Sequence, residues 1–108
     1  MEVETVHQQE STHDVLAICV NKAGDILFTK GASVCQISDG EVTTLAGVCD
    51  QPGHTDGVGE NARFSELYGL AAGGPDGSIV VSDSENHCIR RTWLGWACKA
   101  KKVWQPKV

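Results

Sequence analysis

Short apolar runs separated by glycine-containing gaps organise the first half of the chain. Each run has the length and the Val, Ile, Leu, Phe and Thr content typical of a β-strand. Glycine in each gap supplies the positive φ that tight turns need. The pattern therefore predicts a four-stranded antiparallel meander. Its runs are VLAICV at 15–20, DILFTK at 25–30, SVCQIS at 33–38 and EVTTLAG at 41–47.

The second half of the chain repeats this pattern more clearly. Apolar runs LYGLAA, SIVVSD and HCIRR follow one another, separated by GGPDG and SEN. Gly24 aligns with Gly77, which sets a period of 53 residues, with one residue inserted in the second copy. A fixed period with four strands per unit predicts the blades of a β-propeller.

Composition supports a β-rich fold. The chain has 108 residues, of which 12 are Gly and only six are aromatic, so turns and small side chains are favoured over long helices. That length is enough for one folded domain.

The motif residues resemble a known repeat. The phrases VTTLAG, DGVGENARF, YGLAA, GSIVVSD and NHCIRR between 42 and 91 closely resemble the NHL repeat, with Cys88 in place of the usual Leu. Residues 15–38 resemble a degenerate preceding copy that lacks the Asn-His pair. The resemblance implies an all-β fold made of four-stranded antiparallel meander blades of an NHL-type β-propeller, incomplete because only about two blades are present.

The resemblance also implies where each segment lies. Complete relatives typically have about six blades, and the first strand of each blade lines the central channel. On this mapping 15–20 and 67–72 are inner strands and 42–47 is an outer one. We expect a polar segment at 1–13, a first blade at 14–47, a connection at 48–66, a second blade at 67–92 and a basic, Trp-rich tail at 93–108.

Two blades cannot close a ring, and three explanations are open. The chain is a piece of a larger propeller, it assembles with further copies of itself, or it persists as an open pair of blades. We favour the first, in which further blades come from the same or another chain.

The polar turns raise the question of a chemical site. Asp83, Asn86 and His87 are close enough in sequence to share a metal ion or act as an acid-base cluster. The alternative, which we favour, is a turn in which Asp and Asn bond backbone amides and His anchors the next strand. We likewise assign DGVGENARF to turns and packing, because it lacks the Lys and Ser/Thr of a phosphate-binding loop. The residues assigned to structural repeat motifs are Asp56, Gly57, Gly59, Ala62, Arg63, Phe64, Gly69, Asp83, Asn86, His87, Ile89 and Arg90.

Charge is divided unevenly along the chain. Residues 1–89 carry three basic residues and all 14 acids, whereas residues 90–108 carry the other six basic residues and no acid. The acidic body argues against nucleic-acid binding by bulk charge, while the tail is suited to RNA or an anionic surface. The five cysteines form no Cys-x-x-Cys pair, and we expect them to be reduced. No signal peptide or membrane-spanning run is evident, so we expect a cytoplasmic protein.

These observations favour a non-enzymatic binding scaffold that recognises a protein partner, without a cofactor or metal. One alternative is part of a channel-centred, metal-dependent propeller enzyme of the lyase or lactonase type. The other is RNA or anionic-surface binding through the tail.

Overall fold

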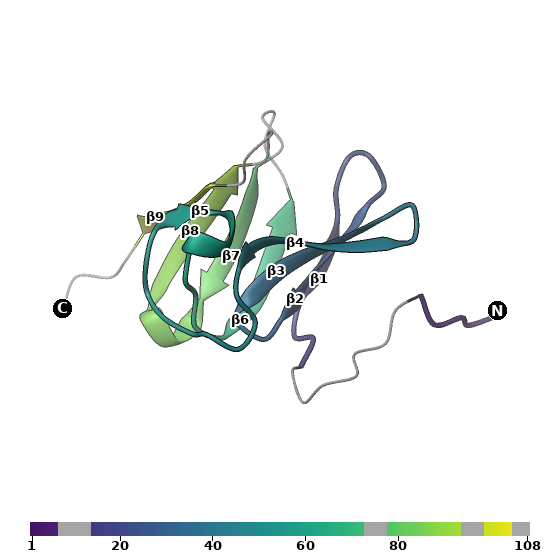
Figure 1. The fold of residues 1–108 in the computed structure, drawn as a ribbon. Coiled ribbons are helices and arrows are strands. Elements are labelled where there is room, and N and C mark those ends of the chain that lie inside the picture. The colour runs from purple at the N-terminus through teal and green to yellow at the C-terminus, as the bar shows by residue number, and fades with distance from the viewer. Residues whose placement is uncertain (7–13, 73–77, 94–98, 105–108) are drawn as a thin grey trace.

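A computed structural model describes residues 1–6, 14–72, 78–93 and 99–104. The described residues form two antiparallel sheets and two short 3-10 helices, η1 (Gly59–Asn61) and η2 (Ser84–Asn86), with no α-helix among them (Figure 1). The prediction of an all-β fold with about two propeller-type blades is confirmed.

The first sheet is the predicted meander. Its strands β1 (Ile18–Val20), β2 (Ile26–Lys30), β3 (Ser33–Ser38) and β4 (Glu41–Gly47) lie in chain order, each antiparallel to the next. The turn between β1 and β2 is held by Asn21, whose Oδ1 accepts hydrogen bonds from the N–H groups of Ala23 and Asp25. Gly24 has φ +87° in this turn, a conformation that favours glycine.

The first strand is shorter than the apolar run predicted. Strand β1 begins at Ile18, because the N–H groups of Leu16 and Ala17 both donate to the side-chain Oγ1 of Thr29 rather than to backbone carbonyls. The buried Thr29 side chain thus replaces part of the backbone ladder just before β1.

The second sheet contains one strand that the sequence analysis placed in a tail. Strands β6 (Leu67–Ala72), β7 (Ile79–Asp83) and β8 (Cys88–Trp93) follow the predicted pattern, and β9 (Lys99–Trp104) pairs with β8 as the fourth strand. The short strand β5 (Gly57–Val58) pairs with the far side of β9. Part of the segment predicted as a tail therefore belongs to a sheet. The inserted residue predicted between β6 and β7 lies in 73–77, outside the described residues.

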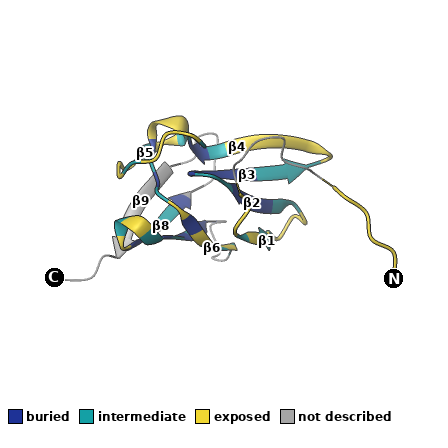
Figure 2. Ribbon diagram, turned by 90° about the horizontal axis from the view of Figure 1, so that it is seen from below, coloured by how far each residue is buried: buried dark blue, intermediate teal, exposed yellow. Residues whose placement is uncertain are grey.

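The hydrophobic core lies between the two sheets. Figure 2 shows the buried positions on the strands where the sheets face one another. Alternation along each strand places one set of side chains on this face, and β1 and β2 contact β6 across it. The core residues are Leu27, Val34 and Ala46 from the first sheet, Leu67, Ile79 and Val81 from the second, and Ala62 and Phe64 from the connection.

Candidate functional site

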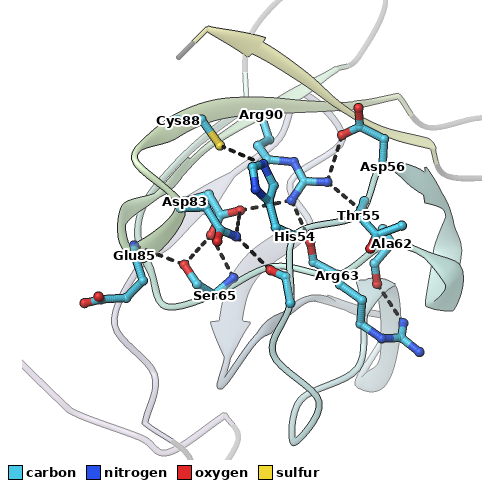
Figure 3. Close-up of polar contacts among 12 residues, drawn as sticks. His54, Thr55, Asp56, Ala62, Arg63, Ser65, Asp83, Glu85, Cys88 and Arg90 are labelled. Atoms are coloured by element: carbon cyan, nitrogen blue, oxygen red, sulfur yellow. Dashed lines mark hydrogen bonds and ion pairs between the residues drawn. The ribbon is translucent and has the colours of Figure 1, made fainter. Parts of the chain in front are cut away.

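Arg90 is the centre of a buried polar network beneath the connection between the sheets (Figure 3). Its side chain is completely buried in β8. One terminal nitrogen, Nη1, donates to the carbonyl oxygen of Arg63 at 2.6 Å and to Asp83 Oδ2 at 2.9 Å. The other, Nη2, donates to the carbonyl oxygen of Thr55 at 2.7 Å and to Asp56 Oδ1 at 2.9 Å. A guanidinium is suited to this role because its donors point in several fixed directions.

Asp83 is the buried anion that faces Arg90. Its Oδ1 accepts hydrogen bonds from the N–H and the hydroxyl of Ser65, at 2.7 and 2.5 Å, and its Oδ2 accepts one from Asn86 at 2.8 Å. Burial acts to raise the pKa of Asp83, but the hydrogen bonds from Asn86, Ser65 and Arg90 together lower it below its ordinary value. Asp83 therefore stays ionised although it is buried.

The turn after β7 brings Asn86 into this network but not the ring of His87. Asn86 Nδ2 also donates to the carbonyl oxygen of Gly53 at 2.7 Å, so it ties the connection to the sheet. His87 is exposed, has φ +54°, and donates its backbone N–H to the carbonyl oxygen of Ser84. Asp83 and Asn86 thus lie together in the network, whereas His87 is exposed beside it.

Two motif residues of the connection, Arg63 and Phe64, contact Arg90. Phe64 is fully buried, and its ring centroid lies 4.7 Å from the Arg90 guanidinium carbon. Arg63 forms an antiparallel bridge with Thr55, and its guanidinium donates to the carbonyl oxygens of Glu60 and Ala62. Arg63 thus binds its own loop, while Ala62 belongs to the core.

The remaining motif residues have backbone roles. Gly57 lies in β5, where a Cβ atom would come within 2.9 Å of the carbonyl group of Asn61. Gly59 opens η1 with φ +55°. Gly69 lies at an irregularity between β6 and β7, where a Cβ atom would come within 2.8 Å of the Ser82 hydroxyl oxygen. Ile89 is half-buried in β8.

Sequence reasoning missed three members of this network. Ser65 contributes a hydroxyl and an N–H, whereas Thr55 and Gly53 contribute carbonyl oxygens. Any residue type can supply a carbonyl, so no pattern identifies Thr55 or Gly53. Ser65 directly follows the matched Ala-Arg-Phe phrase, and this position was its one available signal.

A separate cavity of about 380 Å³ opens between the sheets. Leu16, Ala32, Cys49 and Pro52 are among the residues that line it, and so are three acidic residues, Asp14, Glu66 and Glu85. Glu66 directly precedes β6 and Glu85 lies in η2, whereas Asp14 precedes β1. Both halves of the chain therefore build this cavity, which is also lined by Gly31 and Ser65.

Tyr68 lies close to the acidic residues of this cavity, and a hydrogen bond to one of them and their charges raise its pKa. The Tyr68 hydroxyl donates to Glu66 Oε2 at 2.7 Å, and the side chain is 52% exposed. The hydrogen bond to Glu66, then the charge of Glu66 and, in smaller measure, the charges of Glu85 and Asp14 raise the pKa of the Tyr68 phenol. The three carboxylates and an accessible aromatic ring thus share one region of the surface.

The described residues offer no comparable metal or thiol centre. They contain no group of three or more His, Cys, Asp or Glu side chains that could hold a metal ion. Cys19, Cys35, Cys49 and Cys88 form no disulfide bonds, and Cys88 Sγ lies 4.0 Å from His54 Nε2. No helix in this part of the chain is long and apolar enough to cross a membrane.

Two stacked antiparallel meanders, joined by a connection that is fastened to a buried Arg–Asp pair, define a β-propeller-type repeat domain. Residues 64–91 match the family model of the NHL repeat, and this segment is an NHL repeat. The match runs from Phe64 to the third strand of the second blade, so it contains Asp83, Asn86 and Arg90. No curated protein matches the chain.

Proposed function

We propose that this chain is a non-enzymatic binding module that recognises a basic segment of a protein partner. The cavity between the sheets is the observation that carries the proposal, because both apolar and acidic residues line it. Repeat domains of the NHL type often serve as interaction scaffolds, which supports a protein partner.

The chemistry of the cavity favours a Lys or Arg side chain. A long cationic side chain can lay its methylene groups along Leu16 and Pro52 while its charge meets Glu66 and Glu85. The exposed Tyr68 ring beside Glu66 adds a surface suited to a cation. The excess of acids over bases in residues 1–89 would also speed the approach of a basic partner.

A peptide-binding experiment tests this proposal. A fluorescent peptide of alternating Arg and Leu is titrated against the full chain, with a matched peptide that carries Glu in place of Arg. We expect only the Arg peptide to bind. Glu66→Gln and Glu85→Gln together should weaken binding about tenfold, equivalent to about 1.4 kcal/mol.

The control separates the cavity from the overall charge. Glu41 is exposed in β4 and does not line the cavity, so Glu41→Gln removes a surface charge without touching the proposed site. Binding should be nearly unchanged in this variant. If Glu41→Gln weakened binding as much as either cavity substitution alone, attraction by bulk charge would replace the proposed site.

The alternatives depend on other parts of the molecule. RNA or anionic-surface binding would use the basic residues of 93–108, whose side chains lie outside the described residues. The metal-dependent enzyme would need ligands beyond those that the described residues bring together. A cytoplasmic location stays a prediction.

A further inference from the structure

The first sheet has an apolar face that is turned away from the second sheet. Cross-strand partners share a face, so Ile18 and Phe28 lie together, as do Val20, Ile26, Ile37 and Val42. The core residues Leu27 and Val34 lie on the opposite face. We call this surface the outer face of the first sheet. Its residues Ile18, Val20 and Val42 are 66%, 59% and 39% exposed, whereas Phe28 is only 3% exposed.

The second sheet has an equivalent face, and the first sheet packs against it. In the second sheet Leu70 pairs with Val81, and this pair is equivalent to Ile18 and Phe28 in the first sheet. Ala72 likewise pairs with Ile79, and this pair is equivalent to Val20 and Ile26. In the second sheet this face is packed in the core against the first sheet. The outer face of the first sheet therefore has the pattern of an interface between blades.

The surface that would cover it is also present in the chain. The first sheet covers the second with the face that carries Leu27 and Val34. The equivalent ladder positions in the second sheet are Val80 and Ile89, which are half-buried on its face away from the core. Ala71, on the same face, is exposed. We call this surface the outer face of the second sheet.

We propose that the outer face of the second sheet of one chain packs on the outer face of the first sheet of another copy. Such a contact repeats the interface that the two sheets already form within one chain, because it joins the same two kinds of face. It is a head-to-tail contact between unlike surfaces, and its geometry decides whether the assembly closes into a ring or continues as a chain. This proposal is independent of the basic partner proposed above.

The mass of the full chain in solution tests the proposal. We expect light scattering during size-exclusion chromatography to give a multiple of 11.5 kDa that rises with concentration until assembly is complete. Ile18→Glu should return the mass to that of one chain, because it places a charge in the proposed contact. Thr43→Glu adds the same charge to an exposed residue on the opposite face of the first sheet and should leave the assembly intact.

Two blocked variants distinguish head-to-tail contact from other arrangements. Ile18→Glu blocks only the first sheet and Val80→Glu blocks only the second, so each alone should be monomeric. Their equimolar mixture should form a complex of two chains and no larger species. Far-ultraviolet circular dichroism of each variant verifies that it remains folded.

Three results would overturn the proposal. One is a wild-type chain that stays monomeric at every concentration, whatever other molecule binds the apolar face. Another is a Val80→Glu variant that still forms dimers, since this shows self-pairing of the first sheet. The last is a mixture of the two folded, monomeric variants that fails to form a complex.

Discussion

At the scale of single residues, Arg90 links the NHL repeat to the segment that precedes it. Its two terminal nitrogens reach the carbonyl oxygens of Arg63 and Thr55, and both acids, Asp83 and Asp56. The Asp83 partner is fully buried, while the Asp56 side chain is 49% exposed. A buried pair contributes most through the cost of breaking it, because the partner would be left as an uncompensated charge.

Replacing Arg90 should therefore be strongly destabilising. We expect Arg90→Met to lower the free energy of unfolding by about 3–5 kcal/mol, because Asp83 and two carbonyl groups lose their donor. Urea denaturation provides the measurement. Arg63→Met is the matched control, and it should cost no more than about 1.5 kcal/mol, because Arg63 is only half-buried and bonds its own loop. Equal losses would contradict the assigned role of Arg90.

Stability should also depend on the ionisation of Asp83. Its folded-state pKa is lowered, so its contribution is fully present above its ordinary pKa of about 3.9 and is lost as the pH falls through the folded value. Between about pH 5 and pH 2, Asp83→Asn should show a shallower loss of stability than the wild type, measured by urea denaturation at each pH. Ser65→Ala removes the hydroxyl that bonds Asp83 and should give an intermediate slope. Identical slopes in all three proteins would exclude Asp83 as a source of acid sensitivity.

At the scale of elements, the strands with strong alternation were predictable and the weakly patterned ones were not. Glycine gaps and apolar runs located β2, β3, β4, β6, β7 and β8, since local sequence determines both turns and alternation. The change to a Lys-rich composition suggested a tail, but Lys99–Trp104 forms β9. Lysine is common on strands near sheet edges, and pairing with β8 is a non-local contact that local composition does not encode.

The Arg90 network and the cavity likewise depend on non-local contacts, which local sequence does not encode. The resemblance to the NHL repeat identified Asp83, Asn86 and Arg90 as motif residues. Their partners include Ser65, which lies 18 residues away from Asp83 in sequence, and Thr55, which lies 35 residues away from Arg90. The cavity was not predicted at all, because Asp14 and Glu85 meet there only after the two sheets stack. Residue types and spacing gave the strands, whereas the stacking of distant elements produced the cavity.

The end of β4 supplies a prediction about backbone conformation. Gly47 has φ +81°, and a Cβ atom there would lie 2.5 Å from the carbonyl oxygen of Ala32 and 2.9 Å from Phe64 Cδ2. Gly40 has a similar φ of +78°, but a Cβ atom would have nothing within 4 Å. Thermal or urea unfolding should show that Gly40→Ala costs about 1–2 kcal/mol, the usual penalty of a left-handed conformation.

The two glycines together separate strain from steric overlap. Gly47→Ala should cost at least about 1 kcal/mol more than Gly40→Ala, because an overlap with backbone and a buried ring adds to the same strain. Equal losses would mean that β4 and the connection yield easily at this point, and that the close approach to Phe64 does not fix the end of the strand.

At the scale of the whole molecule, the two sheets depend on a single core. Phe64 belongs to neither sheet, yet it packs in the cluster that joins Leu27 and Val34 to Ile79 and Val81, and its ring supports Arg90. Neither sheet can bury that face by itself, as is typical of stacked repeats. The sheets should consequently unfold as one cooperative unit.

Phe64→Ala tests this coupling. We expect a loss of about 3–5 kcal/mol in the free energy of unfolding, because the substitution removes a fully buried aromatic ring from the shared core. Native-state hydrogen exchange should show that the most protected amides of β3 and of β7 lose protection by the same free energy, since both exchange through global opening. Tyr68→Ala removes an exposed aromatic ring from β6 and should leave both sets nearly unchanged. If protection fell in one sheet alone, the sheets would be independent units, and the connection would join them without making them one cooperative structure.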